Sequence, residues 1–213
     1  MPPDRRLAIE QYRGYAKDYD RAQTRNPEVE RQRARVIDLL RLQRGETVLD
    51  VACGTGLNFP LLEDAVGAEG RIIGIDLSPE MLALARGRVA ARGWQNVTLI
   101  ESAIEDAAIP FESDAALFCL THDVLQSPEA LDNVFRHAKP GARVASLGFK
   151  SLPWWALPWS FVIRRYTRHS MTTRENFDRP WRNLERYVPD LQVETAFMGA
   201  LYLAWGDAAS SGI

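Results

Sequence analysis

The 213-residue chain has few of the features that mark secreted, membrane-spanning or nucleic-acid-binding proteins. Its two cysteines, Cys53 and Cys119, lie inside apolar runs, which predicts buried thiols in a reducing compartment and argues against a disulfide framework. The N-terminus lacks the apolar stretch of a signal peptide, and no apolar run is long enough to cross a bilayer. The net charge of −2 indicates no polyanionic partner, so nucleic acid is not expected to bind. These absences favour a soluble, cytoplasmic protein.

Apolar, β-rich runs alternate with segments of helical spacing over residues 46–149. The alternation predicts an α/β fold with a doubly wound, mostly parallel sheet and helices on both faces. The expected strands cover residues 46–53, 71–76, 96–100, 114–120 and 139–149, and the expected helices cover residues 28–43, 57–67, 77–92, 128–138 and 179–188. Gly45 is expected to end the first helix. Two later runs, 191–197 and 200–205, are expected to close a seven-stranded sheet as an antiparallel hairpin.

The stretch LDVACGTGLN, residues 49–58, places two glycines directly after a short strand-like run. A glycine-rich turn at the carboxyl end of a strand lets a ligand approach the backbone closely. A dinucleotide-binding loop needs a third glycine three residues after the second, and Phe59 stands there instead. Asp50, ahead of the loop, would also repel a phosphate group. The loop therefore suits a cofactor that lacks phosphate and carries a cationic part.

Asp76 ends the second expected strand, twenty residues after Gly56. A carboxylate at this place can accept hydrogen bonds from both hydroxyls of a ribose. A phosphate-free adenosine with a cationic sulfonium and an amino-acid tail satisfies both the loop and Asp76, and that ligand is S-adenosylmethionine (SAM). Phe59 in place of the third glycine disfavours a nicotinamide-dependent oxidoreductase.

Four stretches, VLDVACGTGLN, IIGIDLSPEML, NVTLIESAIED and AKPGARVASLG, occur in this order and resemble the successive motifs of class I SAM-dependent methyltransferases. The resemblance covers roughly residues 12–149. The sequence is similar in particular to the small-molecule group that includes ubiquinone/menaquinone C-methyltransferases and bacterial phospholipid N-methyltransferases. The resemblance implies methyl transfer from SAM to a small-molecule acceptor, with S-adenosylhomocysteine as the product.

The family's cofactor contacts can be carried onto the matching positions of this sequence. They imply that Asp76 holds the ribose and that the glycine loop faces the methionine part of SAM. The expected loop contacts are Asp50, Ala52, Gly54, Gly56 and Asn58. The expected adenine contacts are Leu77, Met81, Ser102, Ala103 and Ile104. Residues expected beneath the transferred methyl group are Thr121 and His122, and the aromatic residue expected to close over the cofactor is Tyr19.

The stretch LTHDVLQS, residues 120–127, turns polar where a buried strand is expected to end. His122 is a candidate catalytic base, because an imidazole has a near-neutral pKa and can take a proton from an acceptor. The alternative is that His122 only lines the pocket. Asp123 is the second catalytic candidate, since it can orient His122 or neutralise a cationic amine; it can also simply cap the helix that follows.

We expect a single domain with N-terminal lid helices (1–45), a cofactor-binding core (46–149) and an acceptor lid with the closing strands (150–213). The tryptophan-rich segment 152–161 is interpreted as lid packing, with an apolar wall for a flat acceptor or contact with a membrane surface as the alternatives. We expect a small-molecule acceptor, a monomer or homodimer, and neither a metal nor a nucleic acid as partner.

Two other functions stay open at this point. A SAM-fold enzyme that catalyses a non-methylating reaction, such as cyclisation, would form no S-adenosylhomocysteine. A non-catalytic SAM-binding partner subunit is opposed only by the intact Thr121–His122–Asp123 stretch. The sequence leaves the identity of the acceptor and the methylated atom undetermined.

Overall fold

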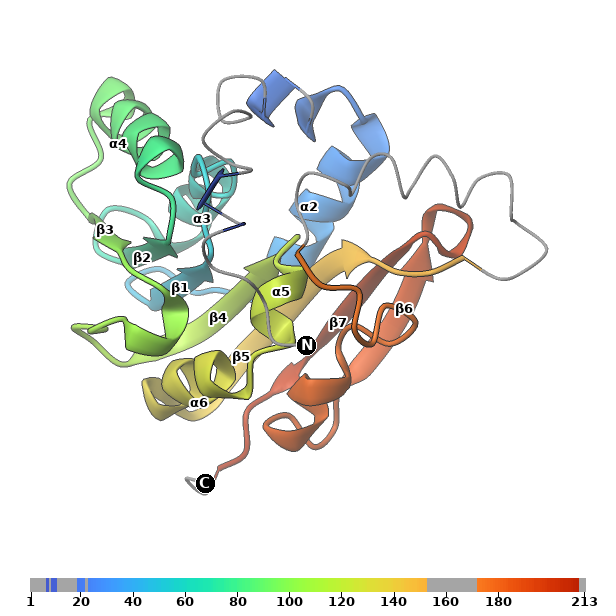
Figure 1. The fold of residues 1–213 in the computed structure, drawn as a ribbon. Helices are drawn as coiled ribbons and strands as arrows, with labels where there is room; N and C mark the ends of the chain where they lie inside the picture. Colours follow the sequence, from blue (N-terminus) through green and yellow to red (C-terminus); the bar gives the residue numbers. More distant parts are fainter. Residues whose placement is uncertain (1–6, 8, 11–18, 22, 153–171, 211–213) are drawn as a thin grey trace.

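The computed structural model of the chain describes residues 7, 9–10, 19–21, 23–152 and 172–210 (Figure 1). The α-helices are α2 (Pro27–Leu39), α3 (Phe59–Val66), α4 (Pro79–Arg92), α5 (His122–Leu125) and α6 (Pro128–Arg136). The strands are β1 (Thr47–Val51), β2 (Arg71–Asp76), β3 (Val97–Glu101), β4 (Ser113–Cys119), β5 (Ala138–Phe149), β6 (Gln192–Ala196) and β7 (Leu201–Asp207). The 3₁₀ helices within the described ranges are η1 (Ile104–Asp106), η4 (Arg182–Arg186) and η5 (Phe197–Gly199).

Seven strands form one sheet in the order β3-β2-β1-β4-β5-β7-β6. The strands β1 to β5 pair in parallel, whereas β7 pairs antiparallel with both β5 and β6. The last strand, β7, therefore lies inside the sheet, and β6 forms its edge (Figure 1). The predicted doubly wound α/β sheet with a closing antiparallel hairpin is confirmed.

Alternate residues of the central strands pack against different helices, so that both faces of the sheet are covered. Val48 and Leu117 belong to one hydrophobic cluster with residues from α2, α3 and α4. Leu49 and Phe118 belong to a second cluster with residues from α6 and η4. All four side chains are fully buried, as expected for parallel strands covered on both sides.

The bounds of α4 follow from its local sequence. Ser78 precedes the helix, and its Oγ accepts a hydrogen bond from the Met81 N–H at 3.2 Å. Pro79 occupies the first turn, where its missing N–H costs no helical hydrogen bond. Gly93 ends the helix in the left-handed region, with φ of 69°. The predicted start of this helix is confirmed.

The helix α2 is shorter than predicted. It ends at Leu39 instead of continuing to residue 43, and Arg41 follows with a φ of 49° that turns the chain out of the helix. Gly45 lies beyond the helix, in the turn before β1, where its N–H donates to the Val66 carbonyl at 2.8 Å. The prediction that Gly45 ends this helix is therefore wrong.

The segment predicted as an α-helix over residues 179–188 contains the 3₁₀ helix η4 instead. Trp181, Leu184 and Tyr187 are buried at a spacing of three residues, which is the repeat of a 3₁₀ helix rather than of an α-helix. Pro180, just before this run, has no N–H to contribute to a longer helix. The burial at every third residue fits the tighter winding.

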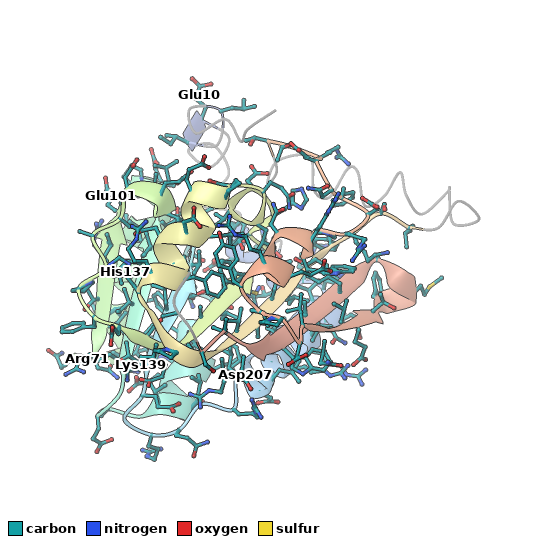
Figure 2. The ribbon with its side chains drawn as sticks, turned by 90° about the horizontal axis from the view of Figure 1, so that it is seen from below. Glu10, Arg71, Glu101, His137, Lys139 and Asp207 are labelled. Atoms are coloured by element: carbon teal, nitrogen blue, oxygen red, sulfur yellow. The ribbon has the colours of Figure 1, made fainter. Side chains whose placement is uncertain are left out.

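Figure 2 shows Arg71, Lys139 and Asp207 along one edge of the molecule and Glu101 toward the opposite edge, on the side where Glu10 lies. Arg71 begins β2 and Glu101 ends β3. The side that carries Glu10 is therefore the one at which the parallel strands end. Open α/β sheets bind their ligands at this edge.

The tryptophan-rich segment falls outside the described residues from residue 153 onward, and its predicted roles stay predictions. In the described part of the chain, no helix has the length and apolar character needed to cross a membrane.

Candidate active site

A cavity opens at the carboxyl ends of β1, β2, β3 and β4. Its empty volume is about 940 Å³, including the open mouth. The strands on the two sides of β1 are β2 and β4, so the chain connections reverse direction beside β1. Such a switch point is where doubly wound sheets bind ligands.

Most of the residues predicted from the sequence lie together on the wall of this cavity. These are Tyr19, Ala52, Gly54, Asp76, Leu77, Met81, Ser102, Ala103, Ile104, Thr121, His122 and Asp123. Three predicted cofactor contacts, Asp50, Gly56 and Asn58, are not on the cavity wall. Asp50 and Asn58 are buried beneath the glycine loop, and Gly56 faces the ring of Phe59.

The two glycines of the loop face different surroundings. Both have positive φ, 57° at Gly54 and 74° at Gly56. A Cβ added to Gly54, which lines the cavity, would meet no protein atom within 4 Å, so this backbone is open to a ligand. A Cβ on Gly56 would lie 2.5 Å from ring atoms of Phe59. Gly56 therefore makes room for the protein's own aromatic ring.

Phe59 occupies the space beneath the loop where a third glycine would bring helix and strand together. It is fully buried, and a Cβ on Gly74 of β2 would lie 2.9 Å from its ring. The first turn of α3 is thus separated from β2 by an aromatic ring. This arrangement differs from the close helix–strand packing that pyrophosphate binding requires.

Asp76 supports the loop and keeps capacity for a ligand. One carboxylate oxygen accepts the Gly54 N–H and the other accepts the Ser78 N–H, each at 2.8 Å. Burial raises the pKa of Asp76, and backbone hydrogen bonds from Ser78, Gly54 and Leu77 oppose that rise. Each oxygen of a carboxylate can accept more than one hydrogen bond. Asp76 therefore keeps acceptor capacity for a ligand hydroxyl while it holds the loop.

Asp50 lies below the cavity and is fully buried. Strand alternation places it on the same face of β1 as Val48, toward α2 and α3. Both of its oxygens accept hydrogen bonds from Asn58 Nδ2, at 2.9 and 3.0 Å. Asn58 Oδ1 in turn accepts from Arg33 Nη1 at 2.6 Å. Asp50 and Asn58 thus hold the loop from beneath, and burial raises the pKa of Asp50 to about 7.

The end of β4 brings unpaired polar groups to the cavity. Thr121 and His122 are each 8% exposed. Among the described residues, neither Thr121 Oγ1 nor either ring nitrogen of His122 has a hydrogen-bond partner of good geometry, although Asp123 and the backbone of Glu175 lie near enough to raise the pKa of His122. Burial is the larger effect and lowers that pKa. His122 is therefore neutral at pH 7, with one donor and one acceptor nitrogen available.

Asp123 makes hydrogen bonds to a different segment. One of its oxygens accepts from Thr172 N at 2.7 Å and Thr172 Oγ1 at 2.6 Å, and the other accepts from Thr173 N at 3.3 Å. It makes no hydrogen bond to His122. In this arrangement Asp123 fixes residues 172 and 173 at the cavity rather than orienting the imidazole.

Two lining residues other than glycine have a left-handed backbone. Ala52 follows β1 with φ of 53°, and Leu120 follows β4 with φ of 62°. This conformation costs about 1–2 kcal/mol for a residue with a side chain. Both costs occur at the ends of the two neighbouring central strands, where the cavity opens, and strained backbone of this kind gathers at functional sites.

The sequence reasoning missed several lining residues. They are Ile9, Ser78, Glu105, Cys119, Leu120, Val124, Ser127 and Thr172. Four of them, Ser78, Glu105, Leu120 and Val124, adjoin residues that were predicted, and Cys119 ends β4, so the strand ends were the signal that could have found these five. Thr172 reaches the site through its hydrogen bonds to Asp123, 49 residues away, and no local pattern indicates that contact.

Residues 48–141 match the protein family described as "Methyltransferase domain". A demethylmenaquinone methyltransferase of Shouchella clausii is 34% identical over 110 residues, which cover 50% of this chain and 46% of that protein. The matched part therefore spans about half the length of this curated relative.

Solved structures share the fold at lower identity. A SAM-dependent methyltransferase from Aquifex aeolicus has a TM-score of 0.54 at 21% identity, over 79% of this chain and 85% of that one. A geranyl diphosphate C-methyltransferase from Streptomyces coelicolor A3(2), solved with Mg²⁺, geranyl diphosphate and S-adenosyl-L-homocysteine, has a TM-score of 0.64 at 18% identity, over 84% and 79%. Residues 48–141 therefore match a methyltransferase domain, and the sheet that contains them has the same fold as these two solved methyltransferases.

Proposed function

We propose that the chain transfers a methyl group from SAM to a small-molecule acceptor and releases S-adenosylhomocysteine (SAH). The observation that carries the proposal is a single cavity shared by Asp76, the open face of Gly54, and the side chains of Thr121 and His122, which have no hydrogen-bond partner within the described part of the chain. The family match over residues 48–141 supports the same activity.

The residues present fit this cofactor. Asp76 has acceptor capacity for a ribose hydroxyl, and Gly54 leaves room for the amino-acid tail to approach the backbone. Leu77 and Met81 give the cavity an apolar wall for the adenine. When bound, SAM supplies a methyl carbon on a sulfonium, whose sulfur departs without needing a proton.

The chain's own contribution is mainly alignment and exclusion of water, which together can supply several orders of magnitude in rate. Leu120 and Val124 are apolar parts of the wall near His122. His122, being neutral, can hold the proton of a hydroxyl or of an activated carbon acceptor. An amine acceptor needs only to be neutral, and a carboxylate acceptor needs no base.

We propose a small-molecule acceptor and do not name the compound. The Shouchella clausii relative is named for demethylmenaquinone, so flat, apolar quinols come first among the acceptors to test. We likewise propose a cytoplasmic location and a monomeric or dimeric state, as the sequence predicts.

Calorimetry is expected to show saturable binding of SAM and SAH and no binding of NAD. Asp76 can accept ribose hydroxyls, whereas Phe59 separates α3 from β2 where pyrophosphate needs close packing. NAD binding in the absence of SAM binding would overturn the proposed function.

Turnover then separates the remaining alternatives. Incubation with SAM and a panel of quinols, phenols, amines, carboxylates and phospholipid headgroups is expected to form SAH and a methylated product. Conversion of a substrate without SAH would indicate a non-methylating reaction such as cyclisation. SAM binding without turnover on any acceptor or with any partner protein would indicate a non-catalytic subunit.

His122→Ala is expected to lower kcat by about 10-fold or less, below the range of 10²–10⁴-fold typical of a lost general base. Asp123 does not orient the imidazole, and alignment alone can drive this reaction. The loss should be the same at every pH from about 7 to 9, where His122 is already neutral because its pKa is lowered. His122→Gln should recover part of the rate, and pH–rate profiles with the identified acceptor measure both.

The matched control for this substitution is His137→Ala. His137 follows α6 (Figure 2). It does not line the cavity, and its Nδ1 lies 2.9 Å from the Asn133 carbonyl oxygen. Its loss should leave kcat unchanged. A large defect in His122→Ala that shrinks at high pH, where the acceptor ionises unaided, would instead identify His122 as the base.

A further inference from the structure

Asp20 connects three segments that are far apart in the sequence. One of its carboxylate oxygens accepts a hydrogen bond from Thr55 Oγ1 at 2.5 Å, and the other accepts from Arg88 Nη2 at 2.6 Å. Arg88 Nε also donates to the Thr55 backbone carbonyl at 3.0 Å. The three residues therefore form a closed network, in which each residue contacts the other two.

Each member of this network stands next to the cavity wall. Asp20 directly follows Tyr19, and Thr55 directly follows Gly54. Arg88 lies on α4, about two turns after Met81. Tyr19, Gly54 and Met81 all line the cavity. The network thus fixes the N-terminal segment, the glycine loop and α4 relative to one another directly behind the wall.

The network consists of one buried residue and two partly exposed side chains. Thr55 is fully buried, whereas the side chains of Asp20 and Arg88 are 39% and 25% exposed. Ion pairs with this degree of exposure contribute little to folding. The sheet, α3 and α4 have their own hydrophobic clusters, to which neither Asp20 nor Arg88 belongs. The main consequence of the network is therefore the position of residues 19 and 20 over the cavity.

We propose that Asp20 is a positioning residue for the cofactor: by binding Thr55 and Arg88 it holds the adjacent Tyr19 at the wall of the cavity and slows the release of bound SAM or SAH. Tyr19 belongs to a segment outside the sheet and forms part of the cavity wall. A ligand beneath this wall leaves faster when the segment is released. The proposal rests on the proposed function, because it takes the cavity as the SAM site.

The experiment measures the rate of SAH release by stopped flow, together with the unfolding temperature of the ligand-free protein. Asp20→Ala and Arg88→Met are expected to release SAH about 10-fold faster than wild type, since most substitutions at a binding site act on the dissociation rate. Asp20→Asn should have a smaller effect, because its amide oxygen still accepts from Thr55 while the ion pair is lost. The unfolding temperature should change little in each variant.

The matched control is Arg86→Met. Arg86 lies on the same helix and forms an exposed ion pair with Glu101, and neither residue lines the cavity. Its variant should release SAH at the wild-type rate. Added salt should accelerate release from wild type more than from Arg88→Met, because only wild type has an ion pair to screen. A purely structural role would not produce this difference.

Two results would overturn the proposal. Wild-type rates of release in both Asp20→Ala and Arg88→Met would show that the network does not hold the cofactor. Equal acceleration in Arg86→Met would reduce the effect to general electrostatics. If Asp20→Ala lowered the unfolding temperature, the comparison of salt dependence would replace it as the test. Faster release with added salt in wild type than in Arg88→Met would then support the proposal, and an equal response in both would contradict it. Failure of wild type to bind SAH at all would remove the proposed function itself, which distinguishes the two failures.

Discussion

Asp76→Ala is expected to lower the affinity for SAH about 100-fold, which corresponds to about 2.8 kcal/mol. The substitution removes the acceptors for the ribose hydroxyls. It also leaves the Gly54 and Ser78 N–H groups without the carboxylate that each contacts at 2.8 Å. Unmet buried hydrogen-bonding groups cost about 1–3 kcal/mol each. Calorimetric titration with SAH measures the change in affinity, and urea denaturation measures the accompanying loss of stability.

Two variants make this test specific. Asp76→Asn retains one carbonyl oxygen and should lose about 10-fold in affinity, in line with a single lost hydrogen bond to a charged group. Glu101→Ala is the matched control, because Glu101 stands opposite Asp76 in the register of β2 and β3 but is exposed and outside the cavity. Its affinity should equal that of wild type. A folded Asp76→Ala protein with wild-type affinity would show that the ribose contact is misassigned.

The sheet could be predicted from the sequence because each element is determined by nearby residues. The run from residue 71 to 76 is both the predicted strand and β2, and Ser78 and Pro79 fix the start of α4. Elements whose bounds depend on distant contacts were predicted less well. α2 ends at Leu39, and Gly45 bonds instead to Val66, which belongs to another helix.

The candidate site shows the same division between local and distant information. Residues at strand ends, such as Asp76 and Thr121, could be located because parallel strands end at a common edge. Asp50 was expected at the cavity from the motif alone, yet its alternation with Val48 already places it on the face toward α2. Its partner Asn58 is held by Arg33, which is 25 residues away in sequence.

The contacts of Asp20 lie beyond any local pattern. Its hydrogen bond to Thr55 spans 35 residues, and its ion pair with Arg88 spans 68. An acidic residue beside a tyrosine on an N-terminal helix has no sequence feature that selects these two partners. Only the packed structure shows that this carboxylate reaches the glycine loop.

Gly54→Ala and Gly56→Ala are expected to separate ligand binding from stability within one loop. Both glycines have positive φ, so alanine at either position carries the same backbone cost of about 1–2 kcal/mol. At Gly56 the new methyl group also meets the Phe59 ring at 2.5 Å, and such overpacking adds about 1–3 kcal/mol. Gly56→Ala should therefore lower the free energy of unfolding by about 3 kcal/mol, and Gly54→Ala by about 1 kcal/mol.

Affinity for SAH should respond in the opposite order. The methyl group of Gly54→Ala meets no protein atom and extends into space that borders the cavity, where the ligand would approach the backbone. Urea denaturation and SAH calorimetry on the two variants measure both effects, and Gly56→Ala combined with Phe59→Leu should recover part of the stability, because a smaller side chain relieves the contact. Equal destabilisation by both single variants would contradict the steric role of Phe59. Unchanged SAH affinity in Gly54→Ala would place the cofactor away from the loop, because a ligand that contacts this backbone cannot share the space with a new methyl group.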